Sequence, residues 1–441
     1  MLSISYTRSV RKVLETERGI HSLPAELICT IFSFTHALRT SPDEKRGVLA
    51  PVHVLGNVCT FWRDISQGLP ELWTDVRIFH CRPGHGEMLG HYFRRSDNLP
   101  LDISLDIPFN IPGEQFFEFW GIILKIWSVA DRWRRLCIIT TVDNFSHIQN
   151  NVGSKMAPGM ESLQLRISES ESAALGRPAL SFRSMNALKS LVLHGVTLVD
   201  AEVSSFIDHL EHLDLFLTPS AIVMQLAEHF DAASQDARAI PRLRHLSLRA
   251  TVPRLHTAPA GALFKSYISS LTTLSLGNFG QWDDNFQSLC NVLDTPVLEE
   301  LRITDLSGAT WLYFTAALSA QSLTFPALRS LQLSFIDDCG MHAHLAIAFP
   351  SLEHLTLLHV ASRTFFSALS ALEPPMVWPH LRSLVLDNAD YRALRGLVEA
   401  RITLGCPLVS LEVDTPPFID AGSLRWVQNH VGTLKRNVPT A

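Results

Sequence analysis

Three glycines and one acidic residue make the pattern in this chain that comes closest to a cofactor site. The strand-like segment DVRIF (75–79) is followed by GHGEMLG, which contains Gly84, Gly86 and Gly90, and Asp102 lies further along. A dinucleotide-binding fold needs a strand, a glycine turn at a helix start and a later acid for the ribose. Here the spacing is GxGxxxG rather than GxGxxG, and we expect no alternating β-α-β series of the right length around it. The sequence therefore predicts no cofactor.

Histidine and cysteine side chains suggest a zinc site at two places, but neither place has a complete ligand set at a defined spacing. We interpret these residues as loop and strand-surface positions. The chain also has no GxSxG nucleophile elbow and no phosphate-binding loop, so we expect neither a metal site nor an enzyme. The two groups are His80, Cys81, His85 and His91, and His209 with His212.

The composition is that of a large folded protein. Of the 441 residues, 46% are apolar and 18% are charged, which excludes a disordered chain. The net charge of −6 gives no reason to expect nucleic acid, whose binding proteins are usually basic. The longest apolar run, FFEFWGIILKIWSVA (116–130), contains Glu118 and Lys125, and we expect a buried amphipathic helix there rather than a membrane span.

The cysteines and the N-terminal segment indicate a reducing compartment. Seven cysteines are scattered singly, with no CxxC spacing, which argues against a secreted disulfide scaffold. The N-terminal segment lacks the continuous apolar core of a signal peptide. We therefore expect a cytoplasmic or nuclear protein that binds no membrane.

A repeated LxxLxL pattern fills most of the chain. Ten segments share it, and they return at intervals of 22 to 33 residues. An eleventh unit, WRRLCI, begins at Trp133. The first residues of the ten segments are Met160, Leu188, Leu210, Leu243, Leu271, Leu298, Leu328, Leu352, Leu381 and Leu408.

Each repeat is predicted to be a strand followed by a returning helix. In LxL the two leucines point to one face and the residue between them to the other, which is the period of a strand. Apolar residues in the spacers fall on one side of a helix. Such a unit cannot bury its own apolar face and is stable only when stacked, which predicts an α/β solenoid. The spacer residues are Ile222, Val223, Leu226 and Phe230; Phe286, Leu289, Cys290 and Leu293; and Tyr391, Leu394, Leu397 and Val398.

Proline precedes six of the repeats by two residues, where it would end a helix and start an extended segment. These prolines are Pro158, Pro241, Pro296, Pro326, Pro350 and Pro379.

This pattern resembles the leucine-rich repeat family over about residues 133–415. It departs from the family at the ninth position of the repeat, where Asn or Cys is common, so we expect an irregular solenoid. That position holds Ser168, Val196, Thr218, Thr251, Phe279, Leu306, Ile336, Val360, Ala389 and Pro416.

The outward residues of the strands form the predicted binding face for a protein target, because stacked strands align them on one concave sheet. The middle of this face is rich in histidine and arginine, and its C-terminal end is acidic. The candidate residues are Arg166, His194, His212, Asp214, Phe216, His245, Arg249, Glu300, Arg302, His354, Asp387, Glu412 and Asp414.

The segment before the repeats predicts short helices. Ser22 can cap the first helix, Pro24 suits its first turn, and Glu26 complements its dipole. The polar stretch 39–47 then interrupts the chain, and the segment GLPELWTDVRIF (68–79) is predicted as a turn, a short helix and a strand. Two apolar stripes at helical spacing are Leu27, Ile28, Ile31, Phe32 and Leu38, and Leu55, Val58, Cys59, Trp62 and Ile65.

These stretches resemble an F-box, the adaptor-binding helical motif of ubiquitin-ligase receptors. LPAELICTIF is similar to its first helix, VCTFWRDIS to its second, and LPELWTDVRI, with Leu72 and Trp73, to the tail found in fungal members. The segment 91–107 resembles the connector that those proteins place before their repeats. The resemblance implies docking on the Skp-type adaptor of a Skp–cullin–F-box ligase. It assigns adaptor binding to Leu23, Pro24, Glu26, Leu27, Ile28, Ile31, Phe32, Val58, Cys59 and Trp62.

The expected organisation is an N-terminal extension (1–19), an F-box-like domain (20–78), a connector with the first repeat-like elements (79–132), the solenoid (133–415) and a C-terminal cap (416–441). The predicted function is that of a substrate receptor, in which the repeats hold a target for ubiquitination. The alternative is a ligase-independent interaction scaffold whose N-terminal helices only cap the solenoid.

Overall fold

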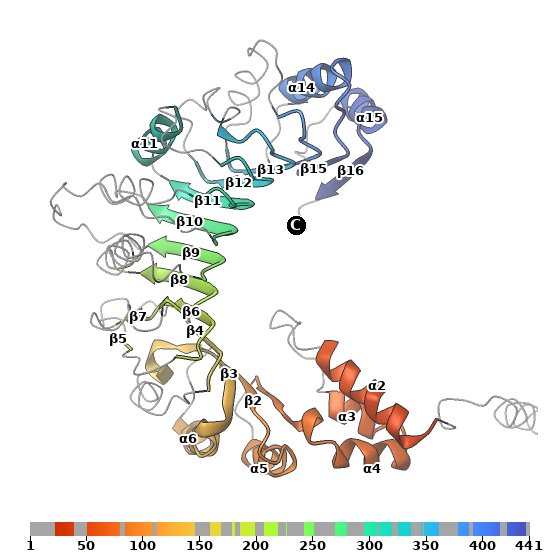
Figure 1. The fold of residues 1–441 in the computed structure, drawn as a ribbon, viewed down its shortest axis with the longest axis vertical. Helices are drawn as coiled ribbons and strands as arrows, with labels where there is room; N and C mark the ends of the chain where they lie inside the picture. Colours follow the sequence, from red (N-terminus) through yellow and green to blue (C-terminus); the bar gives the residue numbers. More distant parts are fainter. Residues whose placement is uncertain are drawn as a thin grey trace, which may run out of the picture. The chain divides into compact units, whose positions relative to one another are not determined.

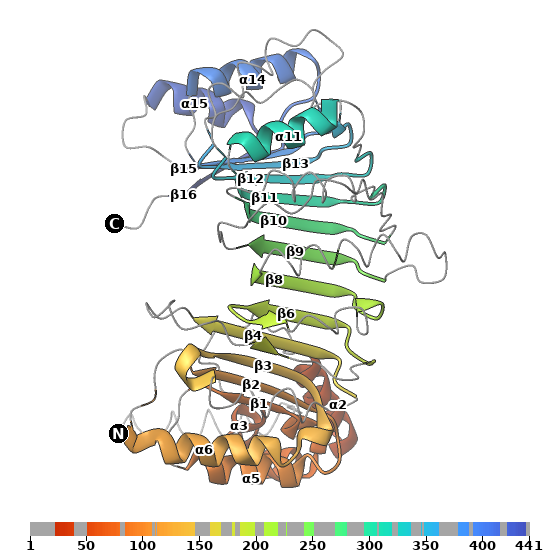
Figure 2. The same ribbon diagram turned by 90° about the vertical axis from the view of Figure 1, so that its left-hand side faces the viewer.

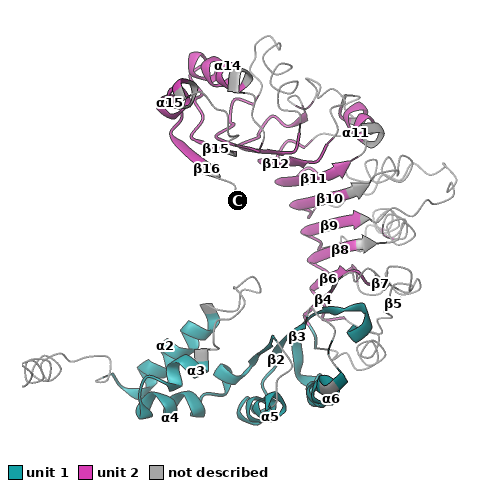
Figure 3. Cartoon of the chain, turned by 180° about the vertical axis from the view of Figure 1, so that it is seen from behind, with its two compact units in different colours: residues 1–160 teal, residues 161–441 magenta. Residues whose placement is uncertain are grey.

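The structure, a computed structural model, describes residues 23–38, 51–79, 84–107, 111, 113–145, 159–168, 179–180, 186–198, 207–218, 226, 242–250, 270–279, 295–306, 308–319, 325–336, 345, 348–360, 378–387, 391–414 and 421–437. The chain divides into two compact units, Met1–Met160 and Glu161–Ala441 (Figure 3). Of the fourteen strands of the main sheet in the described residues, three belong to the first unit and eleven to the second. The domain boundaries predicted from the sequence stay a prediction.

The first unit begins with short helices and continues as alternating strands and helices. The strands pair in parallel, with Val76 opposite Ile103 and Ile103 opposite Leu136, and helices α5 and α6 lie along one face of them (Figure 1). The elements are α2 (Ala25–Leu38), α3 (Pro51–Gly56), α4 (Thr60–Gly68), η2 (Pro70–Trp73), β1 (Asp75–Ile78), α5 (His85–Arg95), β2 (Leu101–Ile107), α6 (Gly113–Trp127), η3 (Ala130–Arg132) and β3 (Trp133–Thr141).

The first helix, α2, starts where the sequence predicts. The carbonyl of Pro24 accepts hydrogen bonds from the N–H groups of Leu27 and Ile28, and Glu26 lies in the first turn. The proposed cap Ser22 and the side chain of Leu38 lie outside the described residues. The predicted short helix and strand in GLPELWTDVRIF are confirmed by η2 and β1.

The second apolar stripe does not form one helix, which corrects the sequence interpretation. It is divided between α3 and α4 at Cys59, whose backbone is extended (φ −160°, ψ 172°). The Cys59 thiol accepts a hydrogen bond from the N–H of Trp62 at 3.4 Å and so caps α4. Val58 and Cys59 therefore precede α4, and of the stripe only Trp62 and Ile65 lie within that helix.

An alternating series, β1-α5-β2-α6-β3, surrounds the glycine pattern, although the sequence analysis expected none. Gly84 precedes α5 with φ +90°, a conformation that favours glycine. The ammonium of Lys125 donates a hydrogen bond to the carbonyl of Gly86 at 2.6 Å. The carboxylate of Asp102 accepts two hydrogen bonds from the guanidinium of Arg134, at 2.9 and 2.7 Å. The acid considered for a ribose thus has a structural partner.

The apolar run 116–130 forms α6, an amphipathic helix as predicted. Phe119, Ile122 and Ile126 are buried, while Phe117 and Leu124 are exposed on the other side. None of the described helices combines the length and the apolarity needed to span a membrane.

The second unit is an open row of parallel strands with helices on one side. The strands follow chain order, and the described helices α11, α14 and α15 lie on the convex side of the row (Figures 1 and 2). A separate pair, β5 (Ala179–Leu180) and β7 (Thr197–Leu198), is also parallel. The other elements are β4 (Ser162–Ser168), β6 (Ser190–His194), β8 (His212–Thr218), β9 (His245–Ala250), β10 (Thr273–Phe279), β11 (Glu300–Leu306), α11 (Gly308–Ser319), β12 (Ser330–Ser334), β13 (His354–Leu358), β14 (Ser383–Leu386), α14 (Tyr391–Thr403), β15 (Ser410–Asp414), α15 (Ala421–His430) and β16 (Thr433–Asn437).

The repeat register predicted from LxxLxL is confirmed. The second leucines face one another across neighbouring strands, as with Leu191, Leu213 and Leu246. In the ten repeats of the unit, the three apolar positions of the pattern are at most 3% exposed. Stacking therefore provides the burial that one repeat alone lacks.

Proline initiates a tight turn before each of four described strands. In the turn at Pro296, the N–H of Leu298 donates to the carbonyl of Thr295 at 3.1 Å, and Pro326, Pro350 and Pro379 have the same bond pattern. Proline fits the second position of such a turn because its φ is already fixed near the required value. Pro158 and Pro241 lie outside the described residues.

Of the three spacer helices that the sequence predicts, one is described in full. The third is α14, with Leu394 and Val398 buried. In the first spacer only Leu226 is described, and it is buried, while the second spacer lies outside the described residues. At the ninth repeat position, apolar side chains are buried where the leucine-rich repeat family often has asparagine: Val196, Leu306, Ile336 and Val360.

Candidate functional site

Three of the residues predicted to bind an adaptor are buried between the helices of the first unit. Ile28 and Phe32 of α2 and Trp62 of α4 are 1%, 0% and 9% exposed. The rings of Phe32 and Trp62 lie edge to face, with centroids 5.0 Å apart. These side chains form the core between α2 and α4, so a partner could reach them only by unfolding the helices.

The same helices also carry exposed apolar side chains outside this core, here called the helical apolar surface. On α2, Leu27, Ile31 and Phe34 follow the i, i+4, i+7 spacing of one helix face and are 51%, 40% and 65% exposed. Val54 in α3, Val58 after α3 and Phe61 in α4 are 48%, 51% and 43% exposed, and the three helices pack against one another.

Sequence reasoning found half of this surface. It included Leu27, Ile31 and Val58 but missed Phe34, Val54 and Phe61. The spacing of Phe34 from Leu27 would have revealed it as part of a second stripe. Of the other predicted residues, Pro24 and Glu26 are exposed, and Leu23 and Cys59 are partly buried.

The tail after α4 fixes the position of the helices. Trp73 is buried, and its indole N–H donates to the carbonyl of Ser66 at 3.0 Å. Nε2 of His36 on α2 lies 3.3 Å from the hydroxyl of Thr74. Burial lowers the pKa of His36, which keeps this imidazole neutral near pH 7. The helices that carry the helical apolar surface are thus held in place by the buried Trp73 and by the contact between His36 and Thr74.

The second candidate region is the outward face of the strands in the second unit, here called the sheet face. Strand pairing puts Arg166, His194, Phe216 and Arg249 in one row across β4, β6, β8 and β9. His212 and His245 form a parallel row, with Thr273 and Glu300 next in line. The sequence predicted this grouping, since it follows from the repeat register.

A polar cluster occupies the middle of the sheet face. Nε2 of His194 lies 3.1 Å from Oδ2 of Asp214, and the guanidinium of Arg249 lies over the ring of Phe216 at 5.8 Å. Burial raises the pKa of Asp214. Hydrogen bonds from His194 and Ser247 and the charges of His194 and Arg249 outweigh that effect and lower the pKa overall. Asp214 is therefore ionised at pH 7.

Two histidines of the face stack on each other. The rings of His212 and His245 are parallel, with centroids 4.2 Å apart and an interplanar angle of 2°. Burial lowers the pKa of both imidazoles, and the charge of a protonated His212 lowers the pKa of His245 further. A neutral stack of this kind presents an aromatic surface, not a cationic one.

The remaining predicted face residues are further along the row. Arg302 and Glu300 form an ion pair at 2.6 Å, which leaves little net charge there. Nδ1 of His359 lies 3.0 Å from Oδ2 of Asp387, which accepts a hydrogen bond from the backbone N–H of His359. His354 is exposed and Glu412 is partly buried, while Asp414 ends β15 and its side chain lies outside the described residues.

Sequence reasoning missed two exposed aromatic residues beside Asp387. The rings of Phe335 and His359 stack with centroids 4.2 Å apart, and both residues have φ of +52°. They occupy the repeat position that Gly195 holds with φ +74°. The positive φ, which costs a side-chain-bearing residue about 1–2 kcal/mol, could not be read from a Phe or His in the sequence.

Among the described residues, no group of three or more His, Cys, Asp or Glu side chains is placed to hold a metal ion. His80 and Cys81 lie outside those residues, whereas His91 and His209 are exposed. Comparison with models of known protein families finds none that matches the chain, and a search of curated proteins finds no match either. The functional argument therefore rests on the two surfaces.

Proposed function

We propose that this protein is the substrate-recognition subunit of a Skp–cullin–F-box type ubiquitin ligase. Its helices α2–α4 would dock on the Skp-type adaptor and, through it, on a cullin. Its sheet face would bind a protein target. The protein would act in the cytoplasm or the nucleus, with no cofactor and no bond-forming chemistry of its own.

The observation that carries this proposal is the helical apolar surface. Six apolar side chains, each at least 40% exposed, lie on α2, α3, α4 and the turn after α3, while other side chains of these helices are buried. Exposed apolar side chains gathered on one small element are typical of a protein interface. The resemblance of these helices to an F-box gives the partner, a Skp-type adaptor.

The energetics of the surface fit a protein complex. Complete burial of a large apolar side chain contributes about 1.5–3 kcal/mol, so covering the exposed half of each of six contributes about 0.7–1.5 kcal/mol apiece, or roughly 4–9 kcal/mol together. That sum is comparable with the roughly 4–15 kcal/mol of freedom lost on association. Polar contacts at the rim would supply the surplus that makes the complex stable.

The solenoid supports the receptor role in a different way. It offers a row of parallel strands whose outward residues alternate with buried leucines, so the face can vary without loss of the core. A receptor of this kind accelerates ubiquitin transfer by holding a target near the charged conjugating enzyme. That tethering replaces a bimolecular encounter with an effectively intramolecular one.

A pull-down with a purified Skp-type adaptor tests the proposal. We expect the full chain to bind, and Leu27→Lys with Ile31→Lys to abolish binding, because two ammonium groups would enter an apolar interface. Phe117→Lys is the matched control, since it changes an exposed apolar residue on α6 in the same way. Absence of binding by the wild type, or equal binding by the double variant, contradicts the proposal.

The alternative function is a ligase-independent interaction scaffold whose N-terminal helices cap the strand row. One observation favours it: α2 and α5 both pack against η2, which leads directly into β1. In that case the helices would be required for stability but not for adaptor binding. The same pull-down separates the two functions, because a scaffold would show no adaptor binding in any variant while the Lys substitutions left its target binding unchanged.

A further inference from the structure

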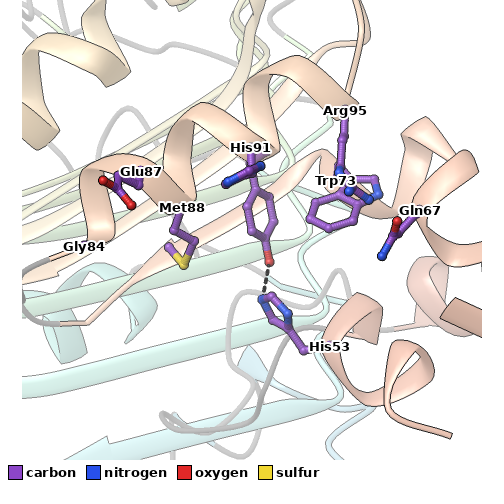
Figure 4. Close-up of a pocket in the computed structure, with 9 residues that line it drawn as sticks. His53, Gln67, Trp73, Gly84, Glu87, Met88, His91 and Arg95 are labelled. Carbon is purple, nitrogen blue, oxygen red and sulfur yellow. Dashed lines mark hydrogen bonds between the residues drawn. The ribbon is translucent and has the colours of Figure 1, made fainter. Parts of the chain in front are cut away.

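A cavity of about 400 Å³ lies within the first unit, between α5 on one side and α3, α4 and η2 on the other. Figure 4 shows Gly84, Met88, His91 and Arg95 along α5, with His53 facing them from α3. Gln67 of α4 and Trp73 of η2 close the end near Arg95. The volume is that of a pocket for a small organic molecule, for which about 300–1,000 Å³ is usual.

The aromatic walls of the cavity are held in place by hydrogen bonds. The indole N–H of Trp73 is engaged by the carbonyl of Ser66, and the hydroxyl of Tyr92 lies 3.0 Å from Nε2 of His53. The rings of Trp73 and Tyr92 meet edge to face at 5.1 Å. Because burial raises the pKa of Tyr92 and lowers that of His53, both groups are neutral near pH 7. The cavity therefore meets the edges of a fixed, uncharged aromatic pair, in which Trp73 is 8% and Tyr92 4% exposed.

Arg95 supplies the charge at one end of the cavity. Its guanidinium stacks on the ring of Trp73 at 4.6 Å, which fixes the plane of the group. Its Nη1 atom is shielded from solvent and has no hydrogen-bond partner among the residues that the structure describes, so a ligand reaches this atom only with a shift of the Arg95 side chain. A desolvated donor without an acceptor is costly, and an anionic acceptor would relieve that cost. The acid of the lining, Glu87, lies eight residues earlier on α5, about 12 Å along the helix axis.

We propose that this cavity binds a small flat aromatic carboxylate, with its ring against Met88 and the exposed edges of Trp73 and Tyr92 and its carboxylate on Arg95. The flat ring suits the aromatic walls, and the carboxylate supplies the two acceptor oxygens that a fixed guanidinium prefers. None of the cavity's lining residues belongs to the helical apolar surface or to the sheet face. Its occupancy would tie α5 to the helices α3 and α4, and the inference does not depend on the ligase function.

Isothermal titration of the full-length protein with benzoate, naphthoate and the uncharged naphthamide tests the site. We expect naphthoate to bind one to one, about tenfold or more tightly than naphthamide, because the carboxylate bonds to a charged donor. Arg95→Met should remove that preference. Arg94→Met deletes the neighbouring exposed guanidinium and is the matched control, with an affinity for naphthoate close to that of the wild type.

A second variant keeps the test decisive if Arg95→Met alters the fold. Met88→Trp fills the cavity from α5 without touching the guanidinium, and it should abolish naphthoate binding while circular dichroism remains that of the wild type. The proposal is overturned if naphthoate fails to bind the wild type, if naphthamide binds equally well, or if Arg94→Met weakens binding as much as Arg95→Met. Preferential binding of a blocked acidic tripeptide would also overturn it, because the site would then be a peptide site.

Discussion

Adjacent residues of α2 should respond in opposite ways to the same substitution. Ile28 is 1% exposed and lies in the core with Phe32 and Trp62, whereas Leu27 is 51% exposed on the helical apolar surface. Replacing a buried Ile by Ala costs about 2–5 kcal/mol, because the cavity left behind does not close fully. Leu27→Ala removes a half-exposed side chain and adds a better helix former, so it should cost at most about 1 kcal/mol.

For adaptor binding by the folded protein, we expect Leu27→Ala to weaken the affinity more than Ile28→Ala. Covering the exposed half of Leu27 is worth about 0.7–1.5 kcal/mol, so its loss should weaken adaptor binding roughly 3- to 12-fold. Ile28→Ala leaves the helical apolar surface intact. In the Ile28→Ala variant, adaptor binding should therefore weaken only to the extent that α2–α4 are unfolded in part of the molecules.

Hydrogen exchange measured by mass spectrometry on the full chain gives the stability of these helices by themselves. Exchange in peptides from α2 and α4 should accelerate by about 30-fold or more in Ile28→Ala and stay close to wild type in Leu27→Ala. Peptides from β8 to β13 serve as the internal control and should be unchanged in both. Equal exchange in the two variants would refute the division of α2 into a buried and an exposed face.

Other substitutions test the solenoid. Arg401 is 2% exposed and donates to the carbonyls of Trp378 and Leu381, so Arg401→Met should lower the thermal midpoint by several degrees, seen by differential scanning calorimetry. Gly195→Ala should also destabilise, because φ is +74° and a Cβ would lie 2.9 Å from a backbone carbonyl oxygen, whereas Gly396→Ala in α14 should not. His212 and His245 have pKa values lowered by burial from 6.5, so the unfolded chain binds more protons below that pH. The free energy of unfolding should fall as the pH drops below about 6.5, and less steeply in a double Asn variant, as urea titrations at neutral and mildly acidic pH can measure.

The repeat architecture could be predicted because its signal is local and recurs. Each LxL gives a strand with two buried leucines, and ten near-regular returns leave only stacking as a way to bury them. The register followed, since pairing leucine with leucine puts His212 opposite His245. Proline two residues before the first leucine of six repeats predicted the start of an extended segment, but not the tight turn found at Pro296.

The details that were missed depend on interactions that a pattern does not contain. The break at Cys59 comes from an extended backbone and a thiol cap, and cysteine is not a usual capping residue. The apolar residues of α2 were interpreted as one stripe, but Ile28 and Leu27 are adjacent and point to different sides. Only the packing of Trp62 against Phe32 decides which side is buried.

The alternating series of strands and helices around Gly84 was also missed, although its first strand, β1, was predicted. Its pairing with β2 and the packing of α5 complete the unit, and both contacts join residues far apart in the sequence. Similarly, the cavity beside Arg95 collects residues from α3, α4, η2 and α5. No single segment of the sequence carries the signal for such a site.

The central claim is that α2–α4 dock on a Skp-type adaptor through the helical apolar surface, and a titration of the purified full chain with the purified adaptor tests it most directly. The account predicts a saturable one-to-one complex with a negative heat-capacity change, as expected for apolar burial. It also predicts that Leu27→Lys, Ile31→Lys and Val58→Lys each weaken the complex by about tenfold or more, while Phe117→Lys does not. A wild-type chain that forms no complex, or Lys variants that bind as tightly as the wild type, would contradict the account.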